Sequence, residues 1–355
     1  MKTLIISSTR PYAGKSGLSL ALLALLDQRG ISAGYFKPYG TMPHGVGQVV
    51  TDEDAEYIGA RSPANAPLDA VSPVVVTRGF IEQILTSDQS VDHSQHVDDS
   101  FARASHGADA MIVEGPSDLA QGRTIGLHLC ALAELLDARV LLVERPDGLR
   151  LPDTVLWTRD CLGDRLIGVV FNAVTESLYP FVSTEVTDFL VRQGLPVFGT
   201  LRHDALLSSA SVAEITAVLN GTVLCAEDHM EDRVERFMVG AMGQDKALRY
   251  FRGRTHKAVI TGGDRSDVQL AALETDTRCL ILTGNLPPAP LVLARAEELG
   301  VPMILVAMDT LSAVERLEGL LGRVRLHDSG KADRIREMLT EAVDIDKLLS
   351  AGFPD

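Results

Sequence analysis

The chain has 355 residues, a formal net charge of −15 at pH 7, and a hydrophobic share of 46% with only 5% aromatic residues. This length predicts two domains with sizeable buried cores. The acidic balance argues against nucleic acid or an anionic membrane as the main partner, although a phosphate-binding loop attracts ATP through its own local field.

Two further features bear on where the protein works. No apolar run is long enough to span a membrane, and we expect no secretory leader because the first apolar run is assigned to a strand. The cysteines are far apart and form no Cys-x-x-Cys pair, which indicates reduced, mostly buried thiols at Cys130, Cys161, Cys225 and Cys279. We therefore expect a cytoplasmic protein.

The first predicted element is a strand at residues 3–7, and a helix at residues 16–28 follows it. Between them, residues 8–16 read Ser-Thr-Arg-Pro-Tyr-Ala-Gly-Lys-Ser. A strand, a loop of small residues ending in Gly-Lys-Ser, and then a helix are the context of a phosphate-binding P-loop. Thr9 stands where the short consensus has glycine, so the loop is a variant, and a chance Gly-Lys-Ser turn is the alternative.

A loop of this kind binds phosphate mainly through its backbone. The N–H groups of the loop and of the first helical turn point at the phosphates, and the helix dipole favours negative charge there. Lys15 would reach the β- and γ-phosphates, and the Ser16 hydroxyl would bind Mg²⁺. We therefore expect ATP and Mg²⁺ as cofactors.

Short apolar runs alternate with helical patterns up to about residue 200, which predicts an α/β fold with a mostly parallel sheet and helices on both faces. The predicted strands are residues 3–7, 32–36, 111–114, 140–144, 166–171 and 197–200. The predicted helices are residues 16–28, 101–106, 126–136, 152–161 and 183–193. Polar residues 87–100 predict a loop or a solvated helix start, and Trp157 is expected in the core.

Three charged side chains are expected at the carboxyl edge of this sheet, where ligands of open α/β sheets bind. Lys37 follows the second strand and could meet a γ-phosphate or a substrate carboxylate, or be an ordinary exposed lysine. Asp54 lies in the acidic segment 52–55 after a Gly-rich loop, and could serve Mg²⁺ or a helix N-terminus. Glu114 ends an apolar strand and would complete an oxygen ligand set for Mg²⁺ with Ser16 and Asp54.

These segments occur in the order found in dethiobiotin synthetase, and they also resemble the N-terminal regulatory part of long phosphotransacetylases. The matching residues are Ser8–Ser16, Gly34–Pro38, Asp54-Ala55 and Val113–Gly115, and the resemblance covers about residues 1–201. It implies a P-loop NTPase fold with a Mg-ATP site.

The resemblance also implies roles for individual residues. The implied catalytic residues are Lys15, Lys37 and Glu114, and the implied metal ligands are Ser16, Asp54 and Glu114. The implied cofactor-binding residues are Ala13, Gly14, Lys15, Ser16, Gly17 and, near the adenine, Asn172. For Asn172, a residue that merely ends a strand in a turn is the alternative.

A second alternation of helices and strands begins near residue 228. The predicted strands are residues 258–261, 279–283 and 303–307, and the predicted helices are residues 231–242, 267–274, 290–299 and 310–321. Residues Val259–Asp267 and Leu280–Gly284 resemble the DRTGG domain, over about residues 205–322. The resemblance implies a regulatory or dimer-forming module.

The Gly-rich loop of this second region has two interpretations. Thr261-Gly262-Gly263 follows a strand and could leave backbone N–H groups open to an anion, with Arg265 adding positive charge. A turn in which Asp264 caps the next helix is the interpretation that we favour.

The domain assignment follows from these patterns. We predict a P-loop NTPase domain of the dethiobiotin-synthetase-like kind at residues 1–204, a connector at 205–227, a smaller α/β DRTGG-like regulatory domain at 228–330, and a C-terminal helix at 331–355 that packs back or dimerises. No phosphotransacetylase catalytic domain follows, so we do not expect acetyl transfer from this chain by itself.

The expected function is that of a nucleotide-binding protein. We expect Mg-ATP binding with slow hydrolysis at most, in a regulatory or nucleotide-sensing member of the phosphotransacetylase N-terminal family. The alternative is an ATP-dependent carboxylate or carbamate ligase of the dethiobiotin synthetase type. The expected partners are a nucleotide, a second copy in a homodimer and a metabolic enzyme.

Overall fold

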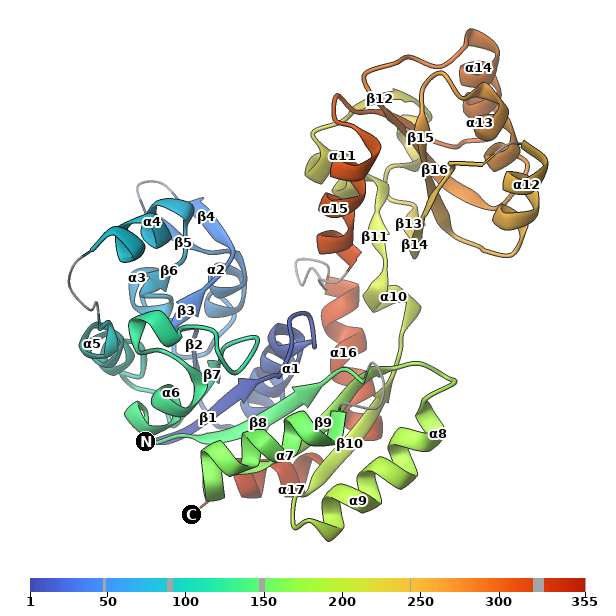
Figure 1. Cartoon of the computed structure of the whole chain (residues 1–355). Coiled ribbons are helices and arrows are strands. Elements are labelled where there is room, and N and C mark those ends of the chain that lie inside the picture. The colour runs from blue at the N-terminus through green and yellow to red at the C-terminus, as the bar shows by residue number, and fades with distance from the viewer. Residues whose placement is uncertain (47–48, 88–91, 147–150, 243, 322–328, 355) are drawn as a thin grey trace. The chain divides into compact units, whose positions relative to one another are not determined.

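The computed structural model describes residues 1–46, 49–87, 92–146, 151–242, 244–321 and 329–354. The chain forms two compact units (Figure 1). The first unit contains Met1–His203 together with Arg325–Asp355, and the second contains Asp204–Val324. Each unit is built of helices around a mostly parallel sheet, so the predicted α/β class is confirmed.

The first unit contains a six-stranded sheet in which every described pairing is parallel. Its strand order is β10 (Val197–Arg202), β9 (Leu166–Val174), β8 (Arg139–Glu144), β1 (Lys2–Ser7), β7 (Ala110–Glu114) and β2 (Ala33–Phe36). The predicted strands are confirmed with small shifts of their ends. Because β1 lies between β8 and β7, the acidic ends of both neighbours flank the loop that follows β1.

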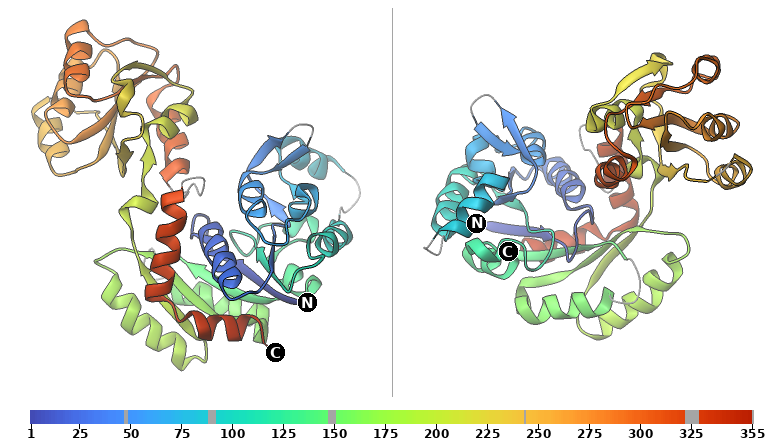
Figure 2. Two further views of the ribbon diagram at one scale, coloured as in Figure 1. Left: turned by 180° about the vertical axis from the view of Figure 1, so that it is seen from behind. Right: turned by 45° about the horizontal axis from the view of Figure 1, so that its top comes forward.

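Helices cover both faces of this sheet. One face packs on α5 (Ser94–Ala104), α6 (Leu129–Leu135), α7 (Leu151–Leu162) and the helix formed by α8 (Tyr179–Phe181), the π-helical turn η3 (Val182–Val186) and α9 (Thr187–Arg192). The other face carries α1 (Lys15–Gln28) and the C-terminal helices α16 (Ser329–Ala342) and α17 (Ile345–Gly352). Figure 2 shows α16 beside α1 from two further directions.

Three local predictions in the first unit need correction. The helix expected at 101–106 already begins at Ser94, which agrees with the solvated helix start that was one of the two alternatives for residues 87–100. Residues 88–91 lie outside the described residues. The Gly-rich loop before Asp52 is a hairpin of β4 (Pro43–Val46) and β5 (Val49–Asp52). Trp157 is 56% exposed, because α7 turns the other side of its surface to the sheet.

Smaller elements complete the first unit. They are β3 (Tyr39–Gly40) paired with β6 (Val74–Val75), the short helices α2 (Glu53–Gly59), α3 (Leu68–Val71) and α4 (Arg78–Thr86), and the 3₁₀ turns η1 (Arg123–Ile125) and η2 (Gly163–Arg165). The helix predicted at 126–136 begins only at Leu129, where the His128 side chain accepts the Ala131 N–H as an N-cap.

The second unit contains a five-stranded sheet in the order β12 (Thr222–Cys225), β17 (Met303–Leu305), β16 (Thr277–Thr283), β15 (Lys257–Gly262) and β14 (Arg236–Val239). The edge strand β12 is antiparallel, and the other pairings are parallel. One face packs on α12 (Gln244–Arg252), α13 (Ser266–Leu273) and α14 (Pro290–Glu298), and the opposite face on α11 (Val212–Leu219) and α15 (Thr310–Leu321).

Two parts of this unit differ from the sequence prediction. The segment expected to be a connector, 205–227, forms α10 (Ala205–Ser208), β11 (Ala210–Ser211), α11, β12 and the start of the 3₁₀ turn η4 (Glu227–His229). The helix expected at 231–242 is wrong: β13 (Arg233–Val234) pairs with β11, and β14 pairs with β15. Val234 and Met238 are buried while their neighbours are more exposed, so the short apolar pattern belongs to strands with one buried face.

The C-terminal helices pack on the sheet and on α1 of the first unit. Of the two predicted roles, packing back and dimerisation, the structure shows the first. The Asp344 N–H donates to the Phe198 carbonyl at 2.9 Å. The Arg29 guanidinium lies 2.5 Å from the Asp346 carboxylate. Val343 forms an isolated antiparallel bridge with Gly199 of β10.

We expect Gly199→Ala to lower the free energy of unfolding of the first unit by about 1–3 kcal/mol, as overpacking does. A Cβ at this position would lie 2.2 Å from the Ala342 carbonyl oxygen and 2.8 Å from Val343 Cα, both of them backbone atoms. Urea unfolding of both proteins measures the effect. Gly45→Ala is the matched control, because a Cβ at Gly45 meets nothing within 4 Å; equal losses in the two variants would contradict the prediction.

Candidate functional site

The loop between β1 and α1 has the backbone form that a P-loop requires. Gly14 precedes α1 with φ +102° and ψ 20°, a left-handed conformation that glycine adopts without strain. A Cβ there would also lie 2.2 Å from the Asn172 amide nitrogen. That nitrogen donates to the Ala13 carbonyl at 2.8 Å, so Asn172 reaches the loop from the end region of β9. The Asn172 side chain thus contacts the backbone of the P-loop.

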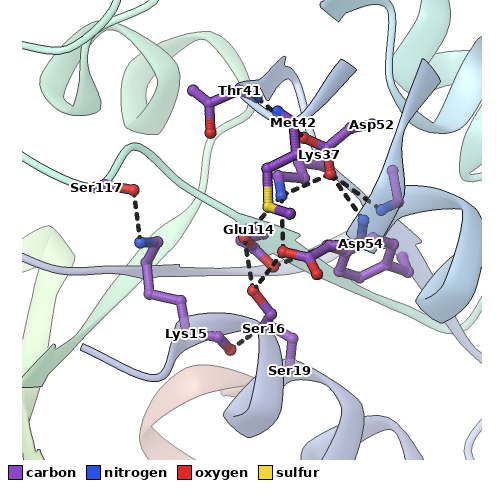
Figure 3. Close-up of polar contacts among 12 residues, drawn as sticks. Lys15, Ser16, Ser19, Lys37, Thr41, Met42, Asp52, Asp54, Glu114 and Ser117 are labelled. Atoms are coloured by element: carbon purple, nitrogen blue, oxygen red, sulfur yellow. Dashed lines mark hydrogen bonds and ion pairs between the residues drawn. The ribbon is translucent and has the colours of Figure 1, made fainter. Parts of the chain in front are cut away.

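Lys15 begins α1, and only 6% of its surface is exposed. Its ammonium donates to Ser117 Oγ at 2.9 Å (Figure 3). It also donates to Ser8 Oγ at 3.3 Å. Burial lowers the pKa of Lys15, and the nearby Glu114 carboxylate only partly offsets this effect. The sequence prediction gave Ser117 no role, although this residue follows Gly115-Pro116 directly after β7.

Ser16, Asp54 and Glu114, the predicted metal ligands, are brought together from three different elements. The Ser16 hydroxyl lies 2.9 Å from Asp54 Oδ2 and 3.1 Å from Glu114 Oε1 (Figure 3). A hydroxyl and two carboxylates are hard oxygen donors, so this set fits Mg²⁺ when phosphate oxygens and water supply the remaining ligands. Among the described residues, no group of three or more His, Cys, Asp and Glu side chains is arranged to hold a metal ion by itself.

Lys37 is buried at the same place, so the alternative of an ordinary exposed lysine is wrong. Its ammonium lies 2.7 Å from Asp52 Oδ1, 3.2 Å from Asp54 Oδ2 and 3.1 Å from Glu114 Oε1. Burial by itself lowers the pKa of Lys37, but the three carboxylates outweigh burial and raise it. For Asp54, burial by itself raises the pKa of the carboxylate. The Lys37 ammonium outweighs this effect, so the pKa of Asp54 lies below its usual value.

Asp52 is the fixed point of this cluster, and the sequence analysis gave it no role of its own. Its side chain is fully buried and caps α2 by accepting the N–H groups of Asp54 and Ala55. The other carboxylate oxygen accepts the N–H groups of Thr41 and Met42, both at 2.9 Å. The acidic segment 52–55, for which a helix N-terminus was one of the two interpretations, is the sequence signal that points to this cap.

Glu114 is held from behind by a buried tyrosine. The Tyr35 hydroxyl, on β2, donates to Glu114 Oε2 at 2.9 Å. Burial, and then the Glu114 charge, raise the pKa of Tyr35 well above its usual value. Together with Ser16 and Lys37 on Oε1, this contact fixes the orientation of the Glu114 carboxylate.

Glu144, at the end of β8, is a further residue to which the sequence prediction assigned no role. Its carboxylate accepts the Thr9 N–H at 2.8 Å and the Thr9 hydroxyl at 2.7 Å. Thr9 stands where the P-loop consensus has glycine. Its side chain allows a hydrogen bond that glycine could not make, and this bond joins the loop to β8. Burial raises the pKa of Glu144 to about 7, although the hydrogen bonds from Thr9 act in the opposite direction. The signal in the sequence is an apolar strand that ends in a glutamate, as at Glu114.

The Gly-rich loop of the second unit has the packed geometry of a turn. Gly263 lies against the Leu286 backbone, and a Cβ would come within 1.6 Å of its carbonyl oxygen. The Gln269 amide donates to the carbonyls of Gly262 and Gly263 at 2.9 and 3.0 Å. Arg265 is paired with Asp267 at 3.0 Å. The favoured turn interpretation fits this geometry, but no side chain caps α13, so the predicted cap by Asp264 is wrong.

The thiols are less buried than expected. Cys225 and Cys279 are buried, Cys130 is partly buried and Cys161 is exposed. Burial and the neighbouring Cys161 raise the pKa of Cys130, so these two thiols of α6 and α7 lie close together.

Comparison with known proteins now places the chain. A family model described as an AAA domain matches residues 2–211. The chain belongs to this AAA-domain family. A second model, described as a DRTGG domain, matches residues 214–320. This order of a P-loop domain and a DRTGG domain confirms the resemblance to the N-terminal part of long phosphotransacetylases. No helix of the described residues is long and apolar enough to cross a membrane.

The curated relatives include enzymes of acetyl transfer. Phosphate acetyltransferase of Pseudomonas aeruginosa is 25% identical over 98% of this chain and 52% of that protein. Phosphate acetyltransferase of Nitrosomonas europaea is 24% identical over 97% of this chain and 50% of that protein. A probable cobyric acid synthase of Halobacterium salinarum is 26% identical over 57% of this chain and 46% of that protein. The chain thus spans about half the length of the curated relatives it matches. The matches to phosphate acetyltransferases and to the DRTGG domain do not favour the ligase alternative.

Solved structures with a partial likeness include a ParA family ATPase, a cell division protein and a regulatory region with a DRTGG domain. A ParA family ATPase of Chlorobium tepidum is 16% identical, covering 57% of this chain and 85% of that chain, with a TM-score of 0.37. The MinD cell division protein of Aquifex aeolicus is 14% identical, covering 58% and 84%, with a TM-score of 0.34. The CBS and DRTGG regulatory region of Clostridium perfringens pyrophosphatase is 16% identical, covering 41% and 70%, with a TM-score of 0.28.

Proposed function

We propose that the first unit binds ATP with Mg²⁺ and that the protein is a regulatory or nucleotide-sensing member of its family, with slow hydrolysis at most. The observation that carries the proposal is the convergence of Lys15 and Ser16 with Asp54 and Glu114 at the end of β1. These side chains come from α1, α2 and β7, and the sheet order places them at one edge.

The residues of the site have complementary tasks in this proposal. Mg²⁺ held by Ser16, Asp54 and Glu114 would neutralise charge on the β- and γ-phosphate oxygens. Lys15 would bind the same phosphates from the start of α1, and Lys37 would approach the γ-phosphate or an acceptor carboxylate. Both oxygens of Glu114 already have partners, in Ser16, Lys37 and Tyr35, which leaves this carboxylate poorly placed to activate a water molecule. That arrangement supports slow turnover.

The second unit supports a regulatory role, since its DRTGG match covers residues 214–320. We propose that the protein is a cytoplasmic homodimer and that a metabolic enzyme is its partner. The free thiols of the described cysteines support a reducing compartment. The match to half of several phosphate acetyltransferases supports a partner in acyl-phosphate metabolism.

Lys15→Ala is expected to weaken Mg-ATP binding at least about tenfold, because charge-assisted hydrogen bonds to phosphate contribute about 1.5–3 kcal/mol. Calorimetric titration of wild type and variant measures the loss. Lys347→Ala, which removes an exposed lysine of α17, is the matched control and should bind as wild type does.

Two outcomes would count against the proposal. Absence of binding heat from wild type would mean that the loop does not bind ATP. ATP turnover that requires an added small carboxylic acid would favour the ligase alternative.

A further inference from the structure

One lysine ammonium contacts three carboxylates at the site, two of them buried and one partly buried. Lys37 Nζ lies within 2.7–3.2 Å of oxygens of Asp52, Asp54 and Glu114, and only 6% of the Lys37 side chain is exposed. Asp52 is fully buried, the Glu114 side chain is 4% exposed, and the Asp54 side chain is 21% exposed. Without a positive charge at this point, three carboxylates would face one another in a medium of low dielectric constant.

The ammonium contacts the same oxygen atoms as the hydroxyl of the proposed metal site. Asp54 Oδ2 and Glu114 Oε1 each lie within 3.2 Å of both the Ser16 hydroxyl and Lys37 Nζ. Figure 3 shows the two carboxylates between Ser16 and Lys37. The oxygens that a divalent cation would use are therefore already in contact with a positive charge of the chain itself.

The three carboxylates hold the ammonium in different ways. Asp52 makes the shortest contact and is itself fixed by four backbone N–H groups, so it is an anchor that cannot easily turn. Asp54 and Glu114 make the longer contacts and also face Ser16. A cation exchange would release these two longer contacts and keep the contact with Asp52.

We propose that Lys37 is a resident cation that occupies the carboxylates of the metal site, so that a divalent cation binds only together with nucleotide phosphate. The inference rests on the proposed function. A divalent cation among these oxygens would lie close to the ammonium and be repelled by it. Phosphate oxygens of a bound nucleotide supply new acceptors to Lys37, which frees Asp54 and Glu114 for the metal.

Lys15 provides an internal comparison. Its ammonium donates to the hydroxyls of Ser8 and Ser117 and makes no described ion pair with a carboxylate. Removal of the Lys15 charge therefore leaves the three contacts of Lys37 with the carboxylates in place. Lys37 lies in direct contact with the carboxylate oxygens, whereas Lys15 acts on Glu114 and Asp54 only through its charge.

The test is Mn²⁺ binding to nucleotide-free protein, followed by the loss of the electron paramagnetic resonance signal of free Mn²⁺. Wild type and Lys15→Met are expected to bind weakly, with dissociation constants of about a millimolar or more. Lys37→Met is expected to bind at least about tenfold more tightly, because its uncompensated carboxylates attract a hard cation. Lys37→Met combined with Asp54→Asn should return to weak binding.

The opposite results would overturn the proposal. They are tight Mn²⁺ binding by nucleotide-free wild type, or no gain in Lys37→Met relative to Lys15→Met. If Lys37→Met does not fold, the wild-type titration still tests the proposal, because tight Mn²⁺ binding without nucleotide would contradict it. Failure of wild type to bind ATP would contradict the proposed function and leave the Mn²⁺ comparison intact, so the two failures are distinguishable.

Discussion

Asp52→Ala is expected to lower the free energy of unfolding of the first unit by about 3–5 kcal/mol, because each buried backbone donor left without its acceptor costs about 1–3 kcal/mol. The substitution leaves four backbone N–H groups without their acceptor, those of Thr41, Met42, Asp54 and Ala55. It also takes away the closest counter-charge of Lys37, at 2.7 Å. Chemical denaturation of wild type and variant at neutral pH measures the loss.

Asp69→Ala is the matched control for this prediction. Asp69 pairs with Arg103 at 2.5 Å, a shorter distance than in the buried pair, but both side chains are more than half exposed. Solvent screening limits such a pair to about 0–1 kcal/mol. The expectation is therefore a large loss for Asp52 and a small one for Asp69. Similar losses in the two variants would show that burial and the backbone contacts of Asp52 do not have the weight assigned to them.

Glu144→Gln is expected to stabilise the protein above neutral pH. Burial raises the pKa of Glu144 from its usual 4.5 to about 7, so the folded state prefers the neutral acid. Between these two values the unfolded chain loses its proton while the folded chain keeps it. Wild-type stability therefore falls as pH rises through this window and levels off above about 7.

The expected size of this effect is about 3 kcal/mol, at about 1.4 kcal/mol for each pH unit between the two values. Glutamine has nearly the same shape and can still accept the Thr9 N–H, but it carries no charge to bury. The variant should match wild type near pH 4.5 and exceed it increasingly up to about pH 8. Denaturation curves over this pH range measure the difference, and a difference that does not change with pH would contradict the assignment.

Much of the first unit could be predicted because its strands are buried on both faces. Such strands appear in a sequence as continuous apolar runs, as at residues 111–114 and 140–144, and their type does not depend on distant partners. The P-loop was recognisable for a related reason. Its strand, its loop and its helix are consecutive, so spacing alone places Lys15 and Ser16 at the start of α1.

Other features depend on residues that lie far apart in the sequence. The strand β14 has a pattern too short to distinguish from a helix, and its pairing with β15 decides its type. The burial of Lys37 depends on carboxylates from β5, α2 and β7, which only the folded sheet brings together. The anchor between Thr9 and Glu144 joins residues separated by 135 positions. In each case the local sequence permits more than one structure, and tertiary contacts select one.

The second unit is inserted into the first along the chain, which has a consequence for the order of folding. The chain leaves the first unit after His203 and returns to it at Arg325. The contact between Arg29 and Asp346 therefore links residues separated by 317 positions. During synthesis from the N-terminus, α16 and α17 emerge only after the whole second unit has been made. The second unit, a continuous segment, can fold while the first still lacks two of its helices, so the part that begins first is completed last.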